Sequence, residues 1–106
     1  MTTLTPMNAK TLAARLKSGE ATLIDIREPD EYAREHIAGA VSVPLSSLER
    51  GHLNVEPKGQ VVFHCKSGMR TNANCVRLAA HVDGEAFVLD GGLDAWKQAG
   101  LSVTGS

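Results

Sequence analysis

Apolar residues follow two spacings along the chain, and segments of the two kinds alternate. Short runs rich in Val, Ile, Leu and Phe predict buried strands, whereas apolar residues recurring every three or four positions predict helices. The predicted strands are Thr22 to Ile26, Val41 to Val43, Val61 to Phe63 and Ala86 to Leu89. The predicted helices are a segment ending at Gly19, PDEYARE from Pro29, Leu45 to Glu49, about Thr71 to Val82, and a segment after Gly91-Gly92 ending at Gly100.

The first of these helices carries sequence signals at both ends. Thr5 is a typical N-cap residue, and Pro6 suits the first helical position. Apolar residues then recur at helical spacing at Ala9, Leu12, Ala13 and Leu16. Gly19 is typical of a helix end. The pattern therefore predicts a helix that begins directly after Thr5.

The alternation of strands and helices predicts the fold class. Strands separated by helices form parallel sheets through right-handed crossovers, and such sheets are covered by helices on both faces. No internal repeat, linker or low-complexity segment divides the chain. We therefore expect a single α/β domain spanning residues 1–106.

Composition and charge narrow the function classes. Of 106 residues, 42% are hydrophobic and 22% charged, and the formal net charge is -1 without a basic stripe, which argues against a nucleic-acid partner. The first ten residues lack the apolar core of a signal peptide, and no segment could span a membrane. Two cysteines without zinc-ligand spacing suit a reducing compartment. We expect a cytoplasmic protein without a metal site.

Polar residues cluster directly after two of the predicted strands, at Asp25 to Glu28 and at Cys65 to Arg70. Ligands of open parallel sheets bind at the carboxyl ends of the strands. In the second cluster, a short glycine-containing loop can turn its amides toward an anion, and a helix N-terminus follows. Lys66 and Arg70 add two positive charges. These features favour the thiolate of Cys65, which becomes the candidate nucleophile.

Cys75 provides a contrast with Cys65. It shares a helical stripe with Leu78, Ala79 and Val82, so we expect it to face the core as a structural residue. His64 is expected to end its strand and support the loop, since a thiolate that has already formed needs no base.

Arg27 and Asp25 stand at the end of another strand. Arg27 could attract an anionic donor, but pairing with Glu28 or Glu31 is an equally good interpretation. Asp25 is expected to fix the backbone of the following loop rather than to take part in chemistry.

Three motifs in order resemble signatures of one known family. HCKSGMRT resembles the active loop of the rhodanese family of sulfurtransferases. LIDIREPDEYAREHIAGAVSVPL resembles the N-terminal signature of that family, and LDGGLDAWKQAGLSV its C-terminal signature. Two positions depart from the pattern: Glu35 replaces a common Gly, and Ala38 a common Pro. Both departures bear on local turn geometry rather than on the loop.

The resemblance implies a rhodanese-like three-layer fold and an activity. In this family a sulfane sulfur passes from thiosulfate or a similar anion to a cysteine, and then to cyanide or a thiol acceptor. The implied catalytic residues are Cys65 and Arg70, and no cofactor is required. The substrate-binding residues that we expect are Lys66, Ser67, Gly68, Met69, Thr71 and Arg27. Met69 would stand at the rim, where an apolar side chain can shape the access of the acceptor.

The length of the loop separates sulfur from phosphorus chemistry. Cysteine-dependent phosphatases place five residues between the Cys and the Arg, whereas only four separate Cys65 from Arg70. One missing residue shortens the chain by roughly 3.5 Å, whereas a persulfide extends only about 2 Å beyond the cysteine sulfur. The count favours sulfur transfer. Two alternatives remain: a non-catalytic interaction module with the same fold, and a phosphatase or arsenate reductase.

Overall fold

Five parallel strands form the centre of the computed structural model, which describes residues 4–48, 58–82 and 84–105. The strands are β1 (Leu4–Met7), β2 (Ala21–Asp25), β3 (Val41–Ser42), β4 (Gln60–His64) and β5 (Ala86–Leu89). They lie in the order β1-β5-β4-β2-β3, and each neighbouring pair is parallel. The predicted α/β class with a parallel sheet is confirmed.

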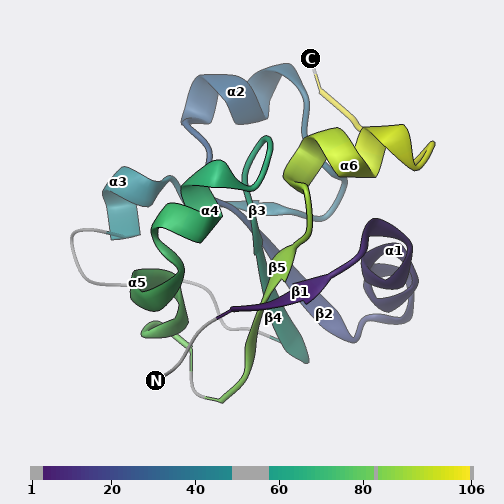
Figure 1. Cartoon of the computed structure of the whole chain (residues 1–106). Helices are drawn as coiled ribbons and strands as arrows, with labels where there is room; N and C mark the ends of the chain where they lie inside the picture. Colours follow the sequence, from purple (N-terminus) through teal and green to yellow (C-terminus); the bar gives the residue numbers. More distant parts are fainter. Residues whose placement is uncertain (1–3, 49–57, 83, 106) are drawn as a thin grey trace.

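Helices cover both faces of this sheet. They are α1 (Ala9–Ser18), α2 (Pro29–Arg34), α3 (Leu45–Leu48), α4 (Met69–Ala73), α5 (Cys75–Ala79) and α6 (Gly92–Gln98). Helices α1 and α6 lie on one face, and α3, α4 and α5 on the other (Figure 1). Because successive strand residues point to opposite faces, the sheet contributes to two apolar cores, one containing Leu12, Val62 and Trp96, the other Ile24, Phe63 and Leu78.

The start of the chain differs from the prediction. Thr5 and Pro6 belong to β1, which pairs with β5, and helix α1 begins at Ala9. The N-cap of α1 is Asn8, whose side chain accepts a hydrogen bond from the Thr11 amide at 2.8 Å. Proline is tolerated in β1 because β1 is an edge strand, where a missing amide hydrogen need not break a ladder.

The helix predicted over Thr71 to Val82 is two helices, α4 and α5, separated by Asn74. The backbone of Asn74 leaves helical geometry at φ -122° and ψ 16°. Its side-chain amide donates to the carbonyl of Arg70 at 2.8 Å, a local bond that competes with continuous helix. In the predicted helix from Leu45, the last residue, Glu49, lies outside the described residues.

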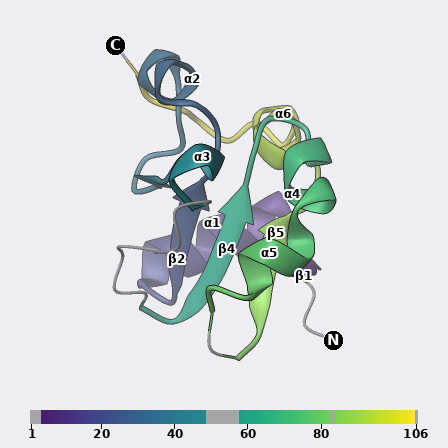
Figure 2. The same ribbon diagram turned by 90° about the vertical axis from the view of Figure 1, so that its left-hand side faces the viewer.

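The register of the sheet brings two strand ends together. Asp25 at the end of β2 pairs with His64 at the end of β4. Helix α2 lies beyond this end of the sheet in two perpendicular views (Figures 1 and 2). Both polar clusters predicted from the sequence therefore meet at one edge, below α2.

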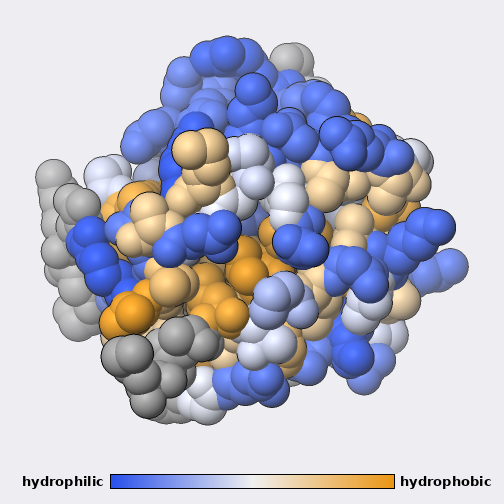
Figure 3. Space-filling view, in the orientation of Figure 1, coloured by the Kyte–Doolittle hydropathy of each residue, from blue (hydrophilic) through white to orange (hydrophobic). Residues whose placement is uncertain are grey.

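The surface differs between α2 and the helices beside it. Hydrophilic residues gather over α2, whereas apolar patches appear over α4 and α5 (Figure 3). Met69 on α4 and Val76 on α5 are the most exposed large apolar side chains of the described residues, at 76% and 52%. None of the helices in the described part of the chain has the length and apolar character needed to cross a bilayer.

Candidate active site

Cys65 follows β4 directly, and its side chain is almost completely buried, at 1% exposure. The amide of Gly68 donates a hydrogen bond to its sulfur atom at 3.2 Å. The hydroxyl oxygen of Thr71 lies 3.8 Å from the same sulfur and donates to the carbonyl of Gly68 at 2.9 Å. The loop thus folds back on the sulfur, which lies beside a backbone donor and a buried hydroxyl group.

Gly68 can make this contact because it adopts a left-handed backbone. Its φ is +96°, and it caps the N-terminus of α4. Residues with a Cβ rarely adopt this conformation, whereas glycine does so readily. The sequence therefore places glycine where the chain must turn from the loop into α4 with its amide aimed at the sulfur.

The opposite side of the loop is held by the start of α6. The amide of Leu93 donates to the carbonyl of Cys65, and that of Asp94 to the carbonyl of Lys66, both at 2.9 Å. The approach requires Gly92, because a Cβ there would lie 2.6 Å from the Cys65 carbonyl oxygen. This support was not predicted from the sequence. The adjacent glycines before a helix were the signal that could have indicated it.

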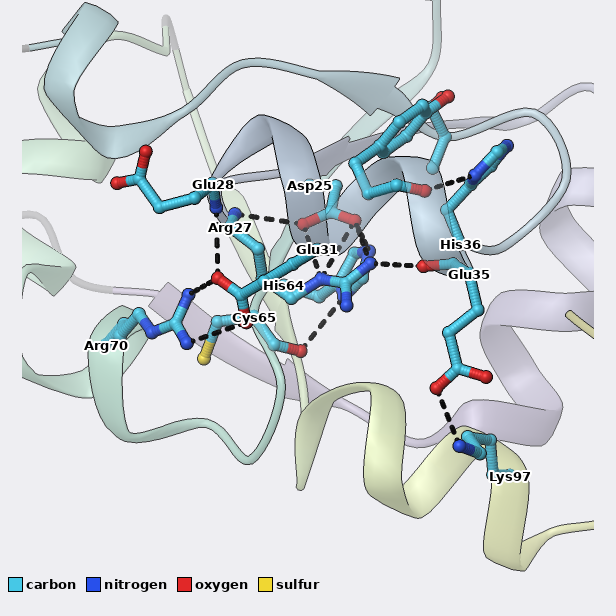
Figure 4. A network of polar contacts seen from close by, with 12 residues as sticks. Asp25, Arg27, Glu28, Glu31, Glu35, His36, His64, Cys65, Arg70 and Lys97 are labelled. Carbon is cyan, nitrogen blue, oxygen red and sulfur yellow. Dashed lines mark hydrogen bonds and ion pairs between the residues drawn. The ribbon is translucent and has the colours of Figure 1, made fainter. Parts of the chain in front are cut away.

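Asp25 organises the residues behind the loop (Figure 4). Its carboxylate accepts three side-chain hydrogen bonds from Arg27, at 2.8 to 3.1 Å, and one from the Arg27 amide at 2.9 Å. The expectation that Asp25 fixes the loop backbone is confirmed. The partner of Arg27 is Asp25, so the pairing with Glu28 or Glu31 that the sequence suggested was wrong.

Arg27 is also bound to the end of α2. Its Nη2 donates to the carbonyl of Glu35 at 2.7 Å, and the residue is only 3% exposed. The contact uses a backbone carbonyl, so it does not depend on the residue type at position 35. The backbone there is extended, with φ -160°, so glycine is not required. The Glu35 carboxylate meanwhile pairs with Lys97 on α6 at 2.7 Å. Ala38, the other departure, is exposed.

His64 is buried between Asp25 and the loop. Its Nδ1 lies 3.1 Å from the carbonyl oxygen of Cys65, and its Nε2 lies 3.5 Å from Oδ2 of Asp25. Burial holds the pKa of His64 below its ordinary value, although the charge of Asp25 opposes this shift. A neutral imidazole that donates a hydrogen bond to the backbone carbonyl of Cys65 supports the loop, as we expected.

Arg70 lies on the active loop, but its guanidinium is bound to α2. It makes two hydrogen bonds to the carboxylate of Glu31, at 2.8 and 2.9 Å. Glu31 is held in turn by the amide of Glu28, at 3.1 Å from Oε1. These contacts lower the pKa of Glu31 from 4.5 to about 2, mainly through the hydrogen bonds from Arg70. The sequence suggested Arg70 beside the reacting sulfur, and did not anticipate Glu31 as its partner.

The remaining loop side chains face outward. Lys66, Ser67 and Met69 are exposed. Next to them lies a pocket of about 300 Å³ between α2 and the loop, lined by Arg27, Glu31, Arg34, Glu35 and Lys66. Arg27 and Lys66, two of the predicted substrate-binding residues, are thus brought to one pocket.

Cys75 is half-buried on α5, while its neighbours Leu78 and Ala79 are buried. Its expected position facing the core therefore holds only in part. No group of three or more metal-ligating side chains occurs in the part of the chain that the structure describes.

Comparisons with known proteins agree with this geometry. A family model described as Rhodanese-like domain matches residues 8–99. The chain is 41% identical to the uncharacterized protein slr1261 of Synechocystis sp., over 87% of this chain and 51% of that protein. It is 31% identical to a protein named sulfurtransferase from Allochromatium vinosum, over 92% of each.

Among solved structures, the crystal structure of a rhodanese-related protein from Thermoplasma volcanium matches with a TM-score of 0.79 and 26% identity. The match covers 94% of this chain and 97% of that one. The chain spans about half the length of the first curated relatives it matches, 51% and 41%.

Proposed function

The chain belongs to the rhodanese-like domain family, and we propose that it is a sulfurtransferase that works through a persulfide on Cys65. The observation that carries this proposal is the environment of the Cys65 sulfur, which lies within reach of the Gly68 amide and the Thr71 hydroxyl. A backbone donor aimed at a sulfur atom stabilises negative charge there. The same donor can stabilise the thiolate before transfer and the persulfide after it.

The proposed reaction has two steps. The Cys65 thiolate attacks the outer sulfur of thiosulfate, the sulfur–sulfur bond of the donor breaks, and sulfite leaves with the bonding electron pair. The product is a Cys65 persulfide anion. In the second step cyanide, or a thiolate, attacks the outer sulfur of this persulfide. Thiocyanate or a new persulfide leaves, and the Cys65 thiolate is regenerated.

The loop residues have distinct proposed roles. The Gly68 amide and Thr71 stabilise the charged sulfur, and Lys66 at the adjacent pocket attracts the anionic donor. Arg27 lines the same pocket, although its guanidinium is largely occupied by Asp25. Met69 shapes the rim for the acceptor, consistent with its 76% exposure. We also propose a catalytic role for Arg70. Its guanidinium is bound to Glu31, and its positive charge would act on the negative charge of the Cys65 sulfur from within the same loop.

Two observations weigh against phosphoryl transfer. Phosphoryl chemistry needs amides and an Arg around three oxygens of the transferred group. Here the loop has four residues between Cys65 and Arg70, and the Arg70 guanidinium is bound to Glu31. We expect hydrolysis of an aryl phosphate to remain at background. Activity that disappears in Cys65→Ser would instead favour a phosphatase.

The direct test is the mass of the protein after incubation with thiosulfate. We expect the mass of one sulfur atom to be added at Cys65, and cyanide to remove it as thiocyanate. Cys65→Ser should abolish both events, whereas the matched variant Cys75→Ala should retain them. Absence of the sulfur adduct in folded wild-type protein would favour the non-catalytic interaction module.

We propose that the protein is located in the cytoplasm. Cys65 and Cys75 are both free thiols, and free thiols suit a reducing compartment.

A further inference from the structure

The cations around the active loop are almost all matched by carboxylates. Arg27 is paired with Asp25 at 2.8 Å, and Arg70 with Glu31 at 2.8 Å. Two exposed pairs complete the surroundings, Arg34 with Asp30 and Lys97 with Glu35. Among residues 4–48, 58–82 and 84–105, Lys66 is the one cation lining the pocket that pairs with no carboxylate. The pocket therefore offers about one unbalanced positive charge.

Loss of the carboxylate that pairs with Arg70 would add a second unbalanced positive charge, and this charge would lie on the active loop itself. The charge of Cys65 is among the causes that raise the pKa of Arg70, so Arg70 and the sulfur interact electrostatically. The Glu31 carboxylate is ionised at neutral pH, and its two hydrogen bonds from Arg70 pair the two opposite charges directly. Arg70 is thus neutralised by a partner that is 39 residues away in the sequence and belongs to α2 (Figure 4).

We propose that Glu31 determines the charge of the sulfur donor: by holding and neutralising Arg70, it makes the loop favour a singly charged sulfane donor over a doubly charged one. This inference rests on the proposed function and names its donor class. Glu31 lines the pocket beside Lys66, so it repels the second charge of a dianion in addition to occupying Arg70.

Two donors with the same reacting sulfur can distinguish charge from chemistry. Thiosulfate is a dianion at neutral pH, whereas methanethiosulfonate is a monoanion. In both cases the Cys65 thiolate attacks the outer sulfur and the donor sulfur–sulfur bond breaks. The leaving group takes the electron pair as sulfite from thiosulfate and as methanesulfinate from methanethiosulfonate, and Cys65 becomes the same persulfide.

The measurement is the ratio of kcat/KM for thiosulfate to that for methanethiosulfonate, with cyanide as acceptor. In Glu31→Gln the amide can still accept a hydrogen bond from Arg70 but no longer cancels its charge. We expect the ratio to rise about three- to fivefold, the size of one partly exposed charge interaction. The rise should come mainly from a lower KM for thiosulfate. Glu31→Asp, which retains the carboxylate, should stay close to the wild-type ratio.

The control for net charge is Glu85→Gln. Glu85 precedes β5 at the far end of the sheet and accepts a hydrogen bond from Thr5 at 2.9 Å. The Glu85→Gln substitution removes one negative charge at a site away from the active loop, so the ratio of kcat/KM for the two donors should not change. An unchanged ratio in folded Glu31→Gln would overturn the proposal, as would an equal rise in Glu85→Gln.

A binding experiment separates this inference from the proposed function. Sulfate and methanesulfonate are unreactive anions with two charges and one charge. The Nε–H signal of Arg70 in NMR spectra, assigned with Arg70→Lys, reports their binding. We expect Glu31→Gln to strengthen sulfate binding several-fold more than methanesulfonate binding, even if neither donor is turned over. Equal changes for the two anions would contradict the role of Glu31, whereas absent turnover alone would contradict only the sulfurtransferase activity.

Discussion

The amide nitrogen of Gly68 lies 3.2 Å from the sulfur of Cys65, and the carbonyl of the same residue accepts a hydrogen bond from the Thr71 hydroxyl at 2.9 Å. One glycine thus connects the sulfur with the buried hydroxyl group beside it. Because its φ is +96°, a residue with a Cβ would strain this turn. The positions of the amide and the hydroxyl group beside the sulfur therefore depend on the backbone conformation of Gly68 rather than on a charged side chain.

Gly68→Ala should therefore impair sulfur transfer. The added Cβ would meet Gly91 at an ordinary 3.8 Å, so the cost is torsional, about 1 kcal/mol of folding free energy. Relaxation of that strain turns the amide away from the sulfur. Loss of a hydrogen bond to a charged group is worth roughly 1.5–3 kcal/mol, so we expect loading of Cys65 to slow about tenfold or more.

The control for Gly68→Ala is Gly19→Ala at the end of α1. Gly19 also has a positive φ, +78°, with open space around it. Its substitution should lower the melting temperature by a similar amount and leave the rate of thiocyanate formation unchanged. Equal rates in the two variants would show that the Gly68 amide does not assist the sulfur.

Gly92→Ala should disrupt the loop by collision. The new Cβ would stand 2.6 Å from the carbonyl oxygen of Cys65 and 2.7 Å from that of Lys66, so the loop or α6 must move. Overpacking of this kind costs roughly 1–3 kcal/mol. We expect a lower midpoint of urea unfolding together with a large loss of activity.

Gly100→Ala, just after the C-terminal end of α6, is the matched variant. Its φ is +80°, and nothing lies within 4 Å of the added Cβ. It should cost stability through the backbone alone and spare activity. If Gly92→Ala behaved like Gly100→Ala, the contact of α6 with the loop would not be needed for catalysis.

The pair of Glu31 and Arg70 should contribute stability that depends on pH. The pKa of Glu31 is lowered from 4.5 to about 2 in the folded chain. The contribution is therefore fully present above about pH 4.5 and is lost as the pH falls toward 2. Since the Arg70 side chain is 41% exposed, solvent screening limits it to about 1 kcal/mol. The difference in urea unfolding between wild type and Glu31→Gln should be largest above about pH 4.5 and should shrink steadily as the pH falls toward 2.

The buried imidazole of His64 should make the protein less stable in weak acid. Its pKa is lowered in the folded chain by burial, so below pH 6.5 the unfolded chain takes up a proton more readily. The contribution to stability is complete above about pH 6.5 and declines below it. His64→Asn keeps a donor near the Cys65 carbonyl without a titrating ring. The stability advantage of wild type over this variant should shrink by about 1 kcal/mol between pH 7.5 and 5.5. Parallel pH profiles would refute this assignment.

Strand runs and helical spacing predicted most of the architecture because burial dictates both patterns. β2, β4 and β5 were visible as apolar runs, and the loop between β4 and α4 followed from them. β1 was missed because its four residues carry no alternation, and Thr5-Pro6 matches a helix start as well as an edge strand. Its identity depends on pairing with β5, a contact across about 80 residues that no local signal encodes.

The candidate nucleophile could be predicted for a different reason. A cysteine at a strand end, a glycine turn and a helix start are all local features, and the structure places Cys65, Gly68 and Thr71 together. The partners of the arginines are not local in the same sense. Arg70 and Cys65 belong to the same short loop, yet the guanidinium of Arg70 binds Glu31, because α2 lies over the loop. Only the packing of α2 could decide this.

The start of α6 binds the carbonyls of Cys65 and Lys66, whereas the side chains of Lys66, Ser67 and Met69 point into solvent. Placement of the nucleophile and recognition at the rim are consequently separate tasks in this scaffold. Placement of Cys65 depends on backbone hydrogen bonds and glycines. Recognition at the rim depends on the side chains of Lys66, Ser67 and Met69, which are exposed and not part of the core. Randomising those three positions should yield folded variants that differ in their preferences for sulfur donors and acceptors, while the backbone that holds Cys65 stays the same.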